Sequence, residues 1–267
     1  MSVRRRAEDP ALHGVLLVDK PAGPTSHDVV GWVRWVLGVR RVGHAGTLDP
    51  AATGLLVVGV GAATKLAPYL TGADKRYLAR FVLGASTTTA DAEGTVVEAL
   101  ACPPGLEARV PAALAALAEV RALPPPAFSA IHVDGRRAHE LAREGRAPVL
   151  DERSMEVRAL VPGPVLRRGD RVEVEVDLLV SKGTYVRSLA EAFGRSLGVP
   201  AHLGALHRTH SGALGLDHPQ ALTGLHADQV RLEPRADATP GPLRWRLRLP
   251  SSRLPRTLRS TACGSAS

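Results

Sequence analysis

The sequence has few of the residues and motifs that mark several large protein classes. Only two of its 267 residues are cysteine, Cys102 and Cys263, which excludes a disulfide framework and favours a reducing compartment, the cytoplasm. No apolar run approaches the roughly 20 residues of a membrane span. The run at 14–18 is also too short for a signal peptide and lacks its cleavage site. Neither G-x-G-x-x-G after a strand nor G-x-x-x-x-G-K-[ST] occurs, so no nucleotide cofactor is expected.

The net charge of +8 lies mostly at one end of the chain. Residues 231–267 hold eight Arg against two acidic side chains, whereas the other 230 residues hold 26 Lys and Arg against 24 Asp and Glu. We therefore expect a folded body over 1–222 and a flexible Arg/Pro-rich tail over 223–267. Binding of a nucleic acid by the body must depend on local clusters rather than on bulk charge.

Apolar periodicity predicts short strands and helices separated by Gly and Pro. The predicted strands are 14–18, 55–60, 76–83 and 171–180, and the predicted helices are 26–37, 112–120, 137–143 and 185–197. Thr25 or Ser26 can cap the first helix, and Gly38 and Gly198 end two of them. Residues 43–54 are expected to form a Gly-rich loop and 101–109 a linker. Because strict strand–helix alternation is missing, the pattern favours an α+β fold with a central, mainly antiparallel sheet flanked by helices.

The Gly-rich loop contains the first candidate site. Pro50 biases Asp49 towards an extended backbone, so a carboxylate is held on a stiff loop of small residues where a ligand can approach closely. The alternative, favoured by the local sequence alone, is that Asp49-Pro50 only starts a turn. His44, taken alone, is more often a hydrogen-bonding loop or core residue than a ligand.

Two further segments carry candidate side chains. Alternation places Tyr77 on one face with Ala79 and Phe81, where its ring could stack on a base or pack in the core. At the strand-to-helix junction 181–190, Lys182 and backbone N–H groups suit phosphate contact. Arg187 falls in the first turn of the helix, where the macrodipole prefers anions, so it is either held for a partner or solvated.

Other polar groups carry weaker signals. The hydroxylic run 86–89 is expected to be a solvated loop, and Glu173 and Glu175 a solvated strand face. The histidines His202, His207 and His210 lack acidic or Cys partners at metal-ligand spacing, and no C-x-x-C occurs, so no metal site is predicted.

Taken together, these segments resemble the bacterial tRNA pseudouridine synthase B family. The resemblance covers about residues 12–216, with the motifs in the family's order and at compatible spacing. The motifs are 14–21, 43–50 with Thr53-Gly54, Lys75-Arg76-Tyr77, 181–190, and 201–212 with Leu206 and Arg208-Thr209.

The resemblance implies a pseudouridine synthase-like catalytic domain over 1–222 with an RNA-binding cleft lined by 43–54, 75–81 and 181–190. It implies isomerisation of uridine to pseudouridine in the T-loop of tRNA, at the position numbered 55, by a cytoplasmic monomer without cofactor, metal or membrane partner. Asp49 matches the catalytic aspartate, Arg187 the arginine that pairs with it, and Tyr77 the tyrosine that stacks on the uracil. Four more residues match support or substrate-binding positions: Lys20 beneath the Asp49 loop, His44 on the loop nucleotides, and Tyr185 and Leu206 in the pocket.

The chain also departs from the family. Phe128 and His132 stand where Tyr and Lys are common, and His139 where an aromatic is usual, which bears on RNA contacts there. The tail at 223–267 stands in place of the usual small RNA-binding domain. Two rival functions remain open: a non-catalytic tRNA-binding or tRNA-folding protein, and a metal-dependent hydrolase built on the histidines. The first has no need of Asp49, because an anion near phosphates weakens RNA binding.

Overall fold

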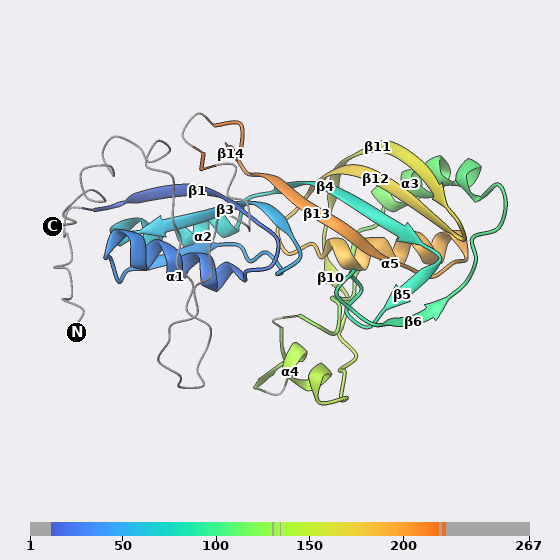
Figure 1. Cartoon of the computed structure of the whole chain (residues 1–267), viewed down its shortest axis with the longest axis horizontal. Coiled ribbons are helices and arrows are strands. Elements are labelled where there is room, and N and C mark those ends of the chain that lie inside the picture. The colour runs from blue at the N-terminus through green and yellow to red at the C-terminus, as the bar shows by residue number, and fades with distance from the viewer. Residues whose placement is uncertain (1–11, 130, 134, 219–220, 223–267) are drawn as a thin grey trace, which may run out of the picture. The chain divides into compact units, whose positions relative to one another are not determined.

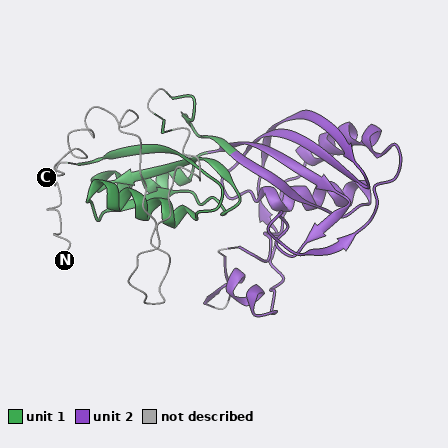
Figure 2. Ribbon diagram, in the orientation of Figure 1, with its two compact units in different colours: residues 1–73, 208–267 green, residues 74–207 purple. Residues whose placement is uncertain are grey.

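The structure is a computed structural model that describes residues 12–129, 131–133, 135–218 and 221–222 (Figure 1). It divides into two compact units, residues 1–73 with 208–267, and residues 74–207 (Figure 2). The predicted tail over 223–267 lies outside the described residues. Of the helices in the described ranges, none is long and apolar enough to cross a membrane.

The first unit is built on the buried strand β3, which pairs antiparallel with β1 and with β2. Its elements are β1 (Gly14–Lys20), α1 (Ser26–Leu37), β2 (Val42–Ala45), β3 (Thr53–Val60), the 3₁₀ helix η1 (Gly61–Leu66), α2 (Ala67–Thr71), the end of β13 (Ala201–Ser211) and β14 (Leu214–Gly215). On one face of β3, Leu56 and Val58 pack against α1. On the other face, Leu55 and Val57 pack against Leu70 of α2. Burial on both faces explains why this strand reads as a continuous apolar run.

Helix α1 has the predicted ends. Thr25 is the N-cap: its hydroxyl accepts from the Asp28 N–H at 3.1 Å, and the Asp28 carboxylate accepts from the Thr25 N–H at 2.8 Å. Gly38 closes the helix with φ +67°, a left-handed conformation that favours glycine. Since Thr25 is the cap, the hydroxyl of Ser26 is available for another contact.

The second unit is an antiparallel sheet with two helices on one face and several small hairpins. Its strands are β4 (Lys75–Leu83), β5 (Ala85–Thr87), β6 (Val96–Ala99), β7 (Ala122–Leu123), β8 (His132–Val133), β9 (Arg136–Arg137), β10 (Arg153–Ser154), β11 (Val157–Arg168), β12 (Arg171–Val180) and the start of β13. Its helices are the 3₁₀ helix η2 (Leu106–Arg109), α3 (Val110–Ala118), α4 (Ala138–Arg143) and α5 (Val186–Leu197).

Strand β12 lies between β4 and β11 and shows the predicted alternation. Its apolar side chains are all buried: Val172, Val174, Val176, Leu178 and Val180. Phe193 of α5 packs on Phe81 of β4 with ring centroids 5.6 Å apart, so α5 covers this face of the sheet. The pairs β1–β3, β2–β3, β4–β12 and β11–β12 are all antiparallel, and together with the helices they confirm the predicted α+β class.

The structure corrects four local predictions. Part of the predicted loop 43–54 is strand β2, because Val42–Ala45 pairs with β3. The predicted linker 101–109 contributes to the core through Cys102 and Leu106, which are 4% and 1% exposed. The long strands β11 and β13 lie where no strand was predicted.

Candidate active site

The loop that carries Asp49 connects β2 to β3 in the first unit and is fixed by the side chain of Ser26. The Ser26 hydroxyl donates to the Leu48 carbonyl at 2.9 Å and accepts from the Leu48 N–H at 2.8 Å. Ser26 and Leu48 are 2% and 3% exposed. Both backbone groups of the residue before Asp49 are therefore satisfied by one buried side chain on α1.

Lys20 fixes the residue after Asp49. Its side chain is fully buried, and its ammonium donates to the carbonyls of Pro21, Pro24 and Pro50 at 2.9, 2.8 and 3.1 Å. The Pro50 carbonyl also accepts from the Gly23 N–H at 2.9 Å. The Lys20 ammonium therefore holds the backbone on the far side of Asp49 from Leu48.

Arg208 holds the start of the same loop and is a residue to which the sequence assigned no role. It is 1% exposed, and its guanidinium donates to the carbonyls of Leu55 and Gly46 at 2.7 and 3.0 Å. Gly54 makes this approach possible: a Cβ there would lie 2.3 Å from the Arg208 carbonyl oxygen. Ser26, Lys20 and Arg208 together give Asp49, which is only partly buried, a fixed backbone.

His44 lies on β2, close to this loop. Its ring meets that of His27 edge to face, with centroids 5.4 Å apart, and its Nδ1 is buried without a hydrogen-bond partner in the described chain. Burial first, and then the charges of His27 and Arg208, lower the pKa of His44 below its ordinary value. His44 is therefore a neutral imidazole at pH 7, able to donate or accept one hydrogen bond at each ring nitrogen.

In the second unit, Arg187 lies in the first turn of α5 and is 7% exposed, so it is not a solvated surface arginine. Its Nη1 donates to the Thr89 carbonyl at 3.0 Å and its Nη2 to the Phe128 carbonyl at 3.1 Å. The Asp91 carboxylate lies 3.7 Å from Nη1. Removing a cation from water is costly, so these hydrogen bonds and the nearby carboxylate are needed to keep Arg187 buried.

Asp91 is a residue that the sequence did not single out. It is 8% exposed, and its carboxylate accepts from the Thr89 hydroxyl and from the Glu93 N–H at 2.5 and 3.1 Å. The Thr87 hydroxyl donates to the Asp91 carbonyl at 2.6 Å. The prediction of a solvated loop over 86–89 is therefore wrong for Thr87 and Thr89, whose hydroxyls build the turn that presents Asp91 to Arg187.

Tyr77 lies on β4, opposite Leu178 of β12. It is 8% exposed and shares the buried face with Ala79 and Phe81, which confirms the predicted alternation. Leu206, on β13 in the same unit, is partly buried.

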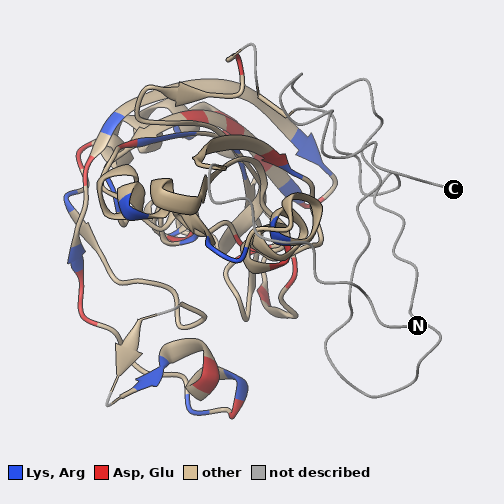
Figure 3. Cartoon of the chain, turned by 90° about the vertical axis from the view of Figure 1, so that its left-hand side faces the viewer, with Lys and Arg blue, Asp and Glu red and all other residues tan. Residues whose placement is uncertain are grey.

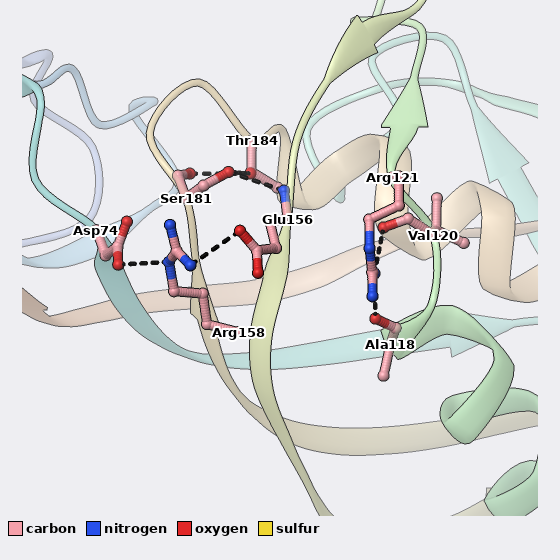
Figure 4. A network of polar contacts seen from close by, with 8 residues as sticks. All are labelled: Asp74, Ala118, Val120, Arg121, Glu156, Arg158, Ser181 and Thr184. Carbon is pink, nitrogen blue, oxygen red and sulfur yellow. Dashed lines mark hydrogen bonds and ion pairs between the residues drawn. The ribbon is translucent and has the colours of Figure 1, made fainter.

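The junction before α5 carries Lys182 and Tyr185. Its Ser181 is bonded to Glu156, the residue that precedes β11 (Figure 4). The Ser181 hydroxyl accepts from the Glu156 N–H at 2.8 Å, and the Ser181 N–H donates to the Glu156 carbonyl at 2.9 Å. The Thr184 hydroxyl donates to the Ser181 carbonyl at 2.9 Å. The turn exposes Lys182 at its tip, while Tyr185 precedes the first residue of α5 and is partly buried.

Arg158 extends this network along β11. Its guanidinium lies between the carboxylates of Asp74 and Glu156, at 2.7 and 2.9 Å (Figure 4). The same figure shows Arg121 donating to the Ala118 and Val120 carbonyls, where a cation suits the end of α3.

The departures Phe128, His132 and His139 lie in the segment between β7 and β10. The Phe128 carbonyl is the one that accepts from Arg187, and His132 is exposed on β8. The His139 backbone N–H donates to the Ser129 carbonyl at 3.0 Å, and its Nδ1 lies 3.0 Å from the same oxygen.

The histidines of the hydrolase alternative have other contacts. His202 is 6% exposed and its Nδ1 lies 2.7 Å from the Ala85 carbonyl oxygen. His210 Nδ1 lies 3.0 Å from the Thr209 hydroxyl. Within the part of the chain that the structure describes, no three His, Cys, Asp or Glu side chains are grouped as metal ligands.

Comparison with known proteins defines the class. A family model described as TruB family pseudouridylate synthase (N terminal domain) matches residues 34–186. Proteins named tRNA pseudouridine synthase B from Mycobacterium sp. (strain KMS) and Leifsonia xyli subsp. xyli (strain CTCB07) are both 46% identical, over 238 and 224 residues. These matches cover 85% and 79% of this chain and 80% and 71% of the relatives.

A solved chain in the crystal structure of a Cbf5-Nop10-Gar1 complex is similar, with a TM-score of 0.58 and 28% sequence identity. The match covers 81% of this chain and 53% of the solved one, so this chain spans about half of that neighbour. The fold and the matches define a pseudouridine synthase, an isomerase that converts uridine to pseudouridine in RNA. The chain belongs to the TruB family of pseudouridylate synthases.

Proposed function

We propose that this enzyme acts on tRNA, isomerising the uridine at position 55 of the T-loop. The relatives named tRNA pseudouridine synthase B support tRNA as the substrate class. The observation that carries the proposal is the fixed backbone of the Asp49 loop. A partly exposed carboxylate held from three sides is preorganised for chemistry at a bound ligand.

The reaction breaks the bond between C1′ and N1 and forms a bond between C1′ and C5 of the same uracil. N1 gains a proton and C5 loses one, so neither water nor an electron carrier is consumed and no cofactor is required. Asp49 attacks the uridine or stabilises positive charge at the sugar while the uracil is detached. One ionised carboxylate is enough for this role, in contrast to the carboxyl pair of glycosidases.

Arg187 and Tyr77 complete the proposed catalytic group. Arg187 matches the family's arginine that pairs with the catalytic aspartate and favours its ionised form, and its hydrogen bonds to Thr89 and Phe128 hold its guanidinium in place. Asp91 offsets part of the cost of burying it. Tyr77 stacks on the uracil and moves the proton in the step that precedes reattachment.

The remaining proposed contacts hold the RNA. Because the reacting atoms are shielded in a folded T-loop, the base must be flipped out. His44 holds the loop nucleotides in its neutral form, and Tyr185 and Leu206 line the pocket around the base. Lys182, exposed at the tip of its turn, contacts phosphate.

The proposed RNA contacts are local and do not depend on the bulk charge of the folded body. In the view of Figure 3, Lys and Arg are interspersed with Asp and Glu along the ribbon. On β4 and β12, Arg76 pairs with Asp177 at 2.7 Å, and Arg80 lies near Glu173 at 3.8 Å. We propose that the enzyme works as a cytoplasmic monomer, and that the segments 43–54, 75–81 and 181–190 contact the RNA.

The test uses Asp49→Asn with a T-stem-loop transcript labelled with tritium at C5 of uridine 55. Because C5 loses its hydrogen, tritium release measures the reaction. We expect no release by the variant and a Kd for the transcript within about threefold of the wild type, since removing an anion near phosphates does not weaken binding. Asp170→Asn, at an exposed position in the β11–β12 turn, is the matched control. It should release tritium and bind the transcript as the wild type does. Tritium release by Asp49→Asn contradicts the mechanism, and an inactive wild type favours the tRNA-binding alternative.

A further inference from the structure

Two consecutive residues at the start of α5 hold a segment that is distant in the sequence. The Ser188 hydroxyl donates to the Pro124 carbonyl at 2.7 Å, and Arg187 Nη2 donates to the Phe128 carbonyl at 3.1 Å. Ser188 is 3% exposed. Residues 124–129, here called the anchor segment, are thus hydrogen-bonded near both ends to the first turn of α5.

The backbone of the anchor segment can form hydrogen bonds to the rest of the unit mainly through its carbonyl groups. Three of its residues, 124–126, are proline and have no backbone N–H to donate. Pro125 and Pro126 are buried, so this part of the segment is held by packing and by its carbonyl oxygens. The Ser129 hydroxyl is buried without a hydrogen-bond partner in the described chain and does not help to anchor it. Packing and the donors of Arg187 and Ser188 together therefore fix the position of the segment.

The anchor segment leads directly into residues 131–152, here called the insert, which contains β8, β9 and α4. The insert returns at β10, which pairs with β7 just before the anchor segment. Within it, the Ala138 N–H donates to the Ile131 carbonyl at 2.7 Å. The His139 N–H of the insert also donates to the Ser129 carbonyl at 3.0 Å, so the anchor segment is the first link of the insert to the rest of the unit.

Arg187 contacts both the turn that carries Asp91 and the anchor segment. One nitrogen of its guanidinium is committed to Thr89 and faces Asp91, and the other is committed to the anchor segment. A displacement of the anchor segment moves the Phe128 carbonyl and with it one of the two acceptors that orient the guanidinium. Ser188 limits that displacement from the adjacent position on the helix.

We propose that Ser188 is a positioning residue that couples the insert to Arg187 through the anchor segment. The inference rests on the proposed function, in which Arg187 orients the catalytic carboxylate. It assigns Ser188 an effect on the chemical step, because its hydroxyl limits movement of the segment whose Phe128 carbonyl helps to orient Arg187.

The test compares Ser188→Ala with Ser188→Thr, which keeps the hydroxyl. Ser196→Ala is the matched control, because that hydroxyl lies on the same helix and donates to the Phe193 carbonyl at 2.8 Å. With enzyme in excess over T-stem-loop, we expect Ser188→Ala to lower the single-turnover rate about tenfold, as expected when a buried carbonyl loses its donor. The transcript Kd should stay within about threefold, and Ser188→Thr and Ser196→Ala should react at nearly the wild-type rate.

Hydrogen exchange of the free proteins provides a readout that does not need activity. Amides of residues 127–139 should exchange faster in Ser188→Ala than in wild type or Ser196→Ala, while those of β12 stay unchanged. Faster exchange without a slower reaction overturns the coupling, and unchanged exchange overturns the anchor itself. Faster exchange in β12 as well would show general destabilisation and also count against the proposal. An inactive wild type refutes the proposed function, whereas the exchange result still tests the anchor.

Discussion

The guanidinium of Arg187 lies 3.7 Å from the carboxylate of Asp91, and both residues are buried, at 7% and 8% exposure. This pair accounts for a cation in the first turn of α5, a position that the helix dipole disfavours. The turn that presents Asp91 is closed by the hydroxyls of Thr87 and Thr89. The pair is thus built from two segments that are far apart in the sequence.

Asp91→Asn keeps the shape of the side chain but removes its charge. We expect the free energy of unfolding to fall by about 3 kcal/mol, the low end of the cost of breaking a buried ion pair. Tritium release from uridine should slow because Arg187 is less firmly oriented. Glu93→Gln makes the same change at an exposed position in the same turn and is the control for urea unfolding and for rate. Equal stability and rate in the two variants would show that the pair has no such role.

Lys20→Met tests the support beneath the Asp49 loop. Methionine retains most of the length of the side chain but removes the donor to the Pro21 and Pro24 carbonyls and leaves the Pro50 carbonyl with the Gly23 N–H alone. We expect the free energy of unfolding to fall by about 2–4 kcal/mol, since each unsatisfied buried carbonyl costs roughly 1–3 kcal/mol. Urea unfolding measures the change against Lys65→Met, which removes an exposed ammonium on η1. A similar loss in both variants would contradict the supporting role.

Elements with one buried face or clear end signals could be predicted from the sequence. Strand β12 has the predicted bounds because its alternate residues are buried. Helices α1 and α5 end at Gly38 and Gly198 as predicted, since both glycines adopt positive φ. Strand β11 was missed because most of its side chains are exposed and no periodic apolar pattern results.

The candidate site was predictable only where residues close in sequence act together or where a family resemblance supplied them. Asp91, Ser26 and Arg208 carry no local signal, because their partners Arg187, Leu48 and Gly46 come from other parts of the chain. Ser26 was interpreted as a possible cap, a role that Thr25 takes instead. Local sequence could not reveal which hydroxyl would be available to hold the loop.

Gly54→Ala tests the close approach of β3 to Arg208. Gly54 has φ +97°, and an added Cβ would lie 2.3 and 2.7 Å from the Arg208 carbonyl oxygen and nitrogen. Both backbones belong to strands that cannot shift cheaply, so we expect a loss of at least about 2–3 kcal/mol in the free energy of unfolding. Gly43→Ala is the control, because a Cβ there meets nothing within 4 Å. Comparable unfolding of the two variants in urea would show that the contact is not tight.

His44 provides a pH-dependent prediction. Burial, His27 and Arg208 lower its pKa from the ordinary 6.5, so its NMR titration should have a midpoint below 6.5, assigned by loss of the signal in His44→Gln. His27→Ala removes the second cause, and the midpoint should move up towards 6.5 without reaching it, because burial remains. Between the folded and unfolded pKa values the unfolded chain binds more protons, so this residue's contribution to stability is lost as pH falls below 6.5. A midpoint at or above 6.5, or one that does not move in His27→Ala, would show that the two rings do not influence each other as their geometry implies.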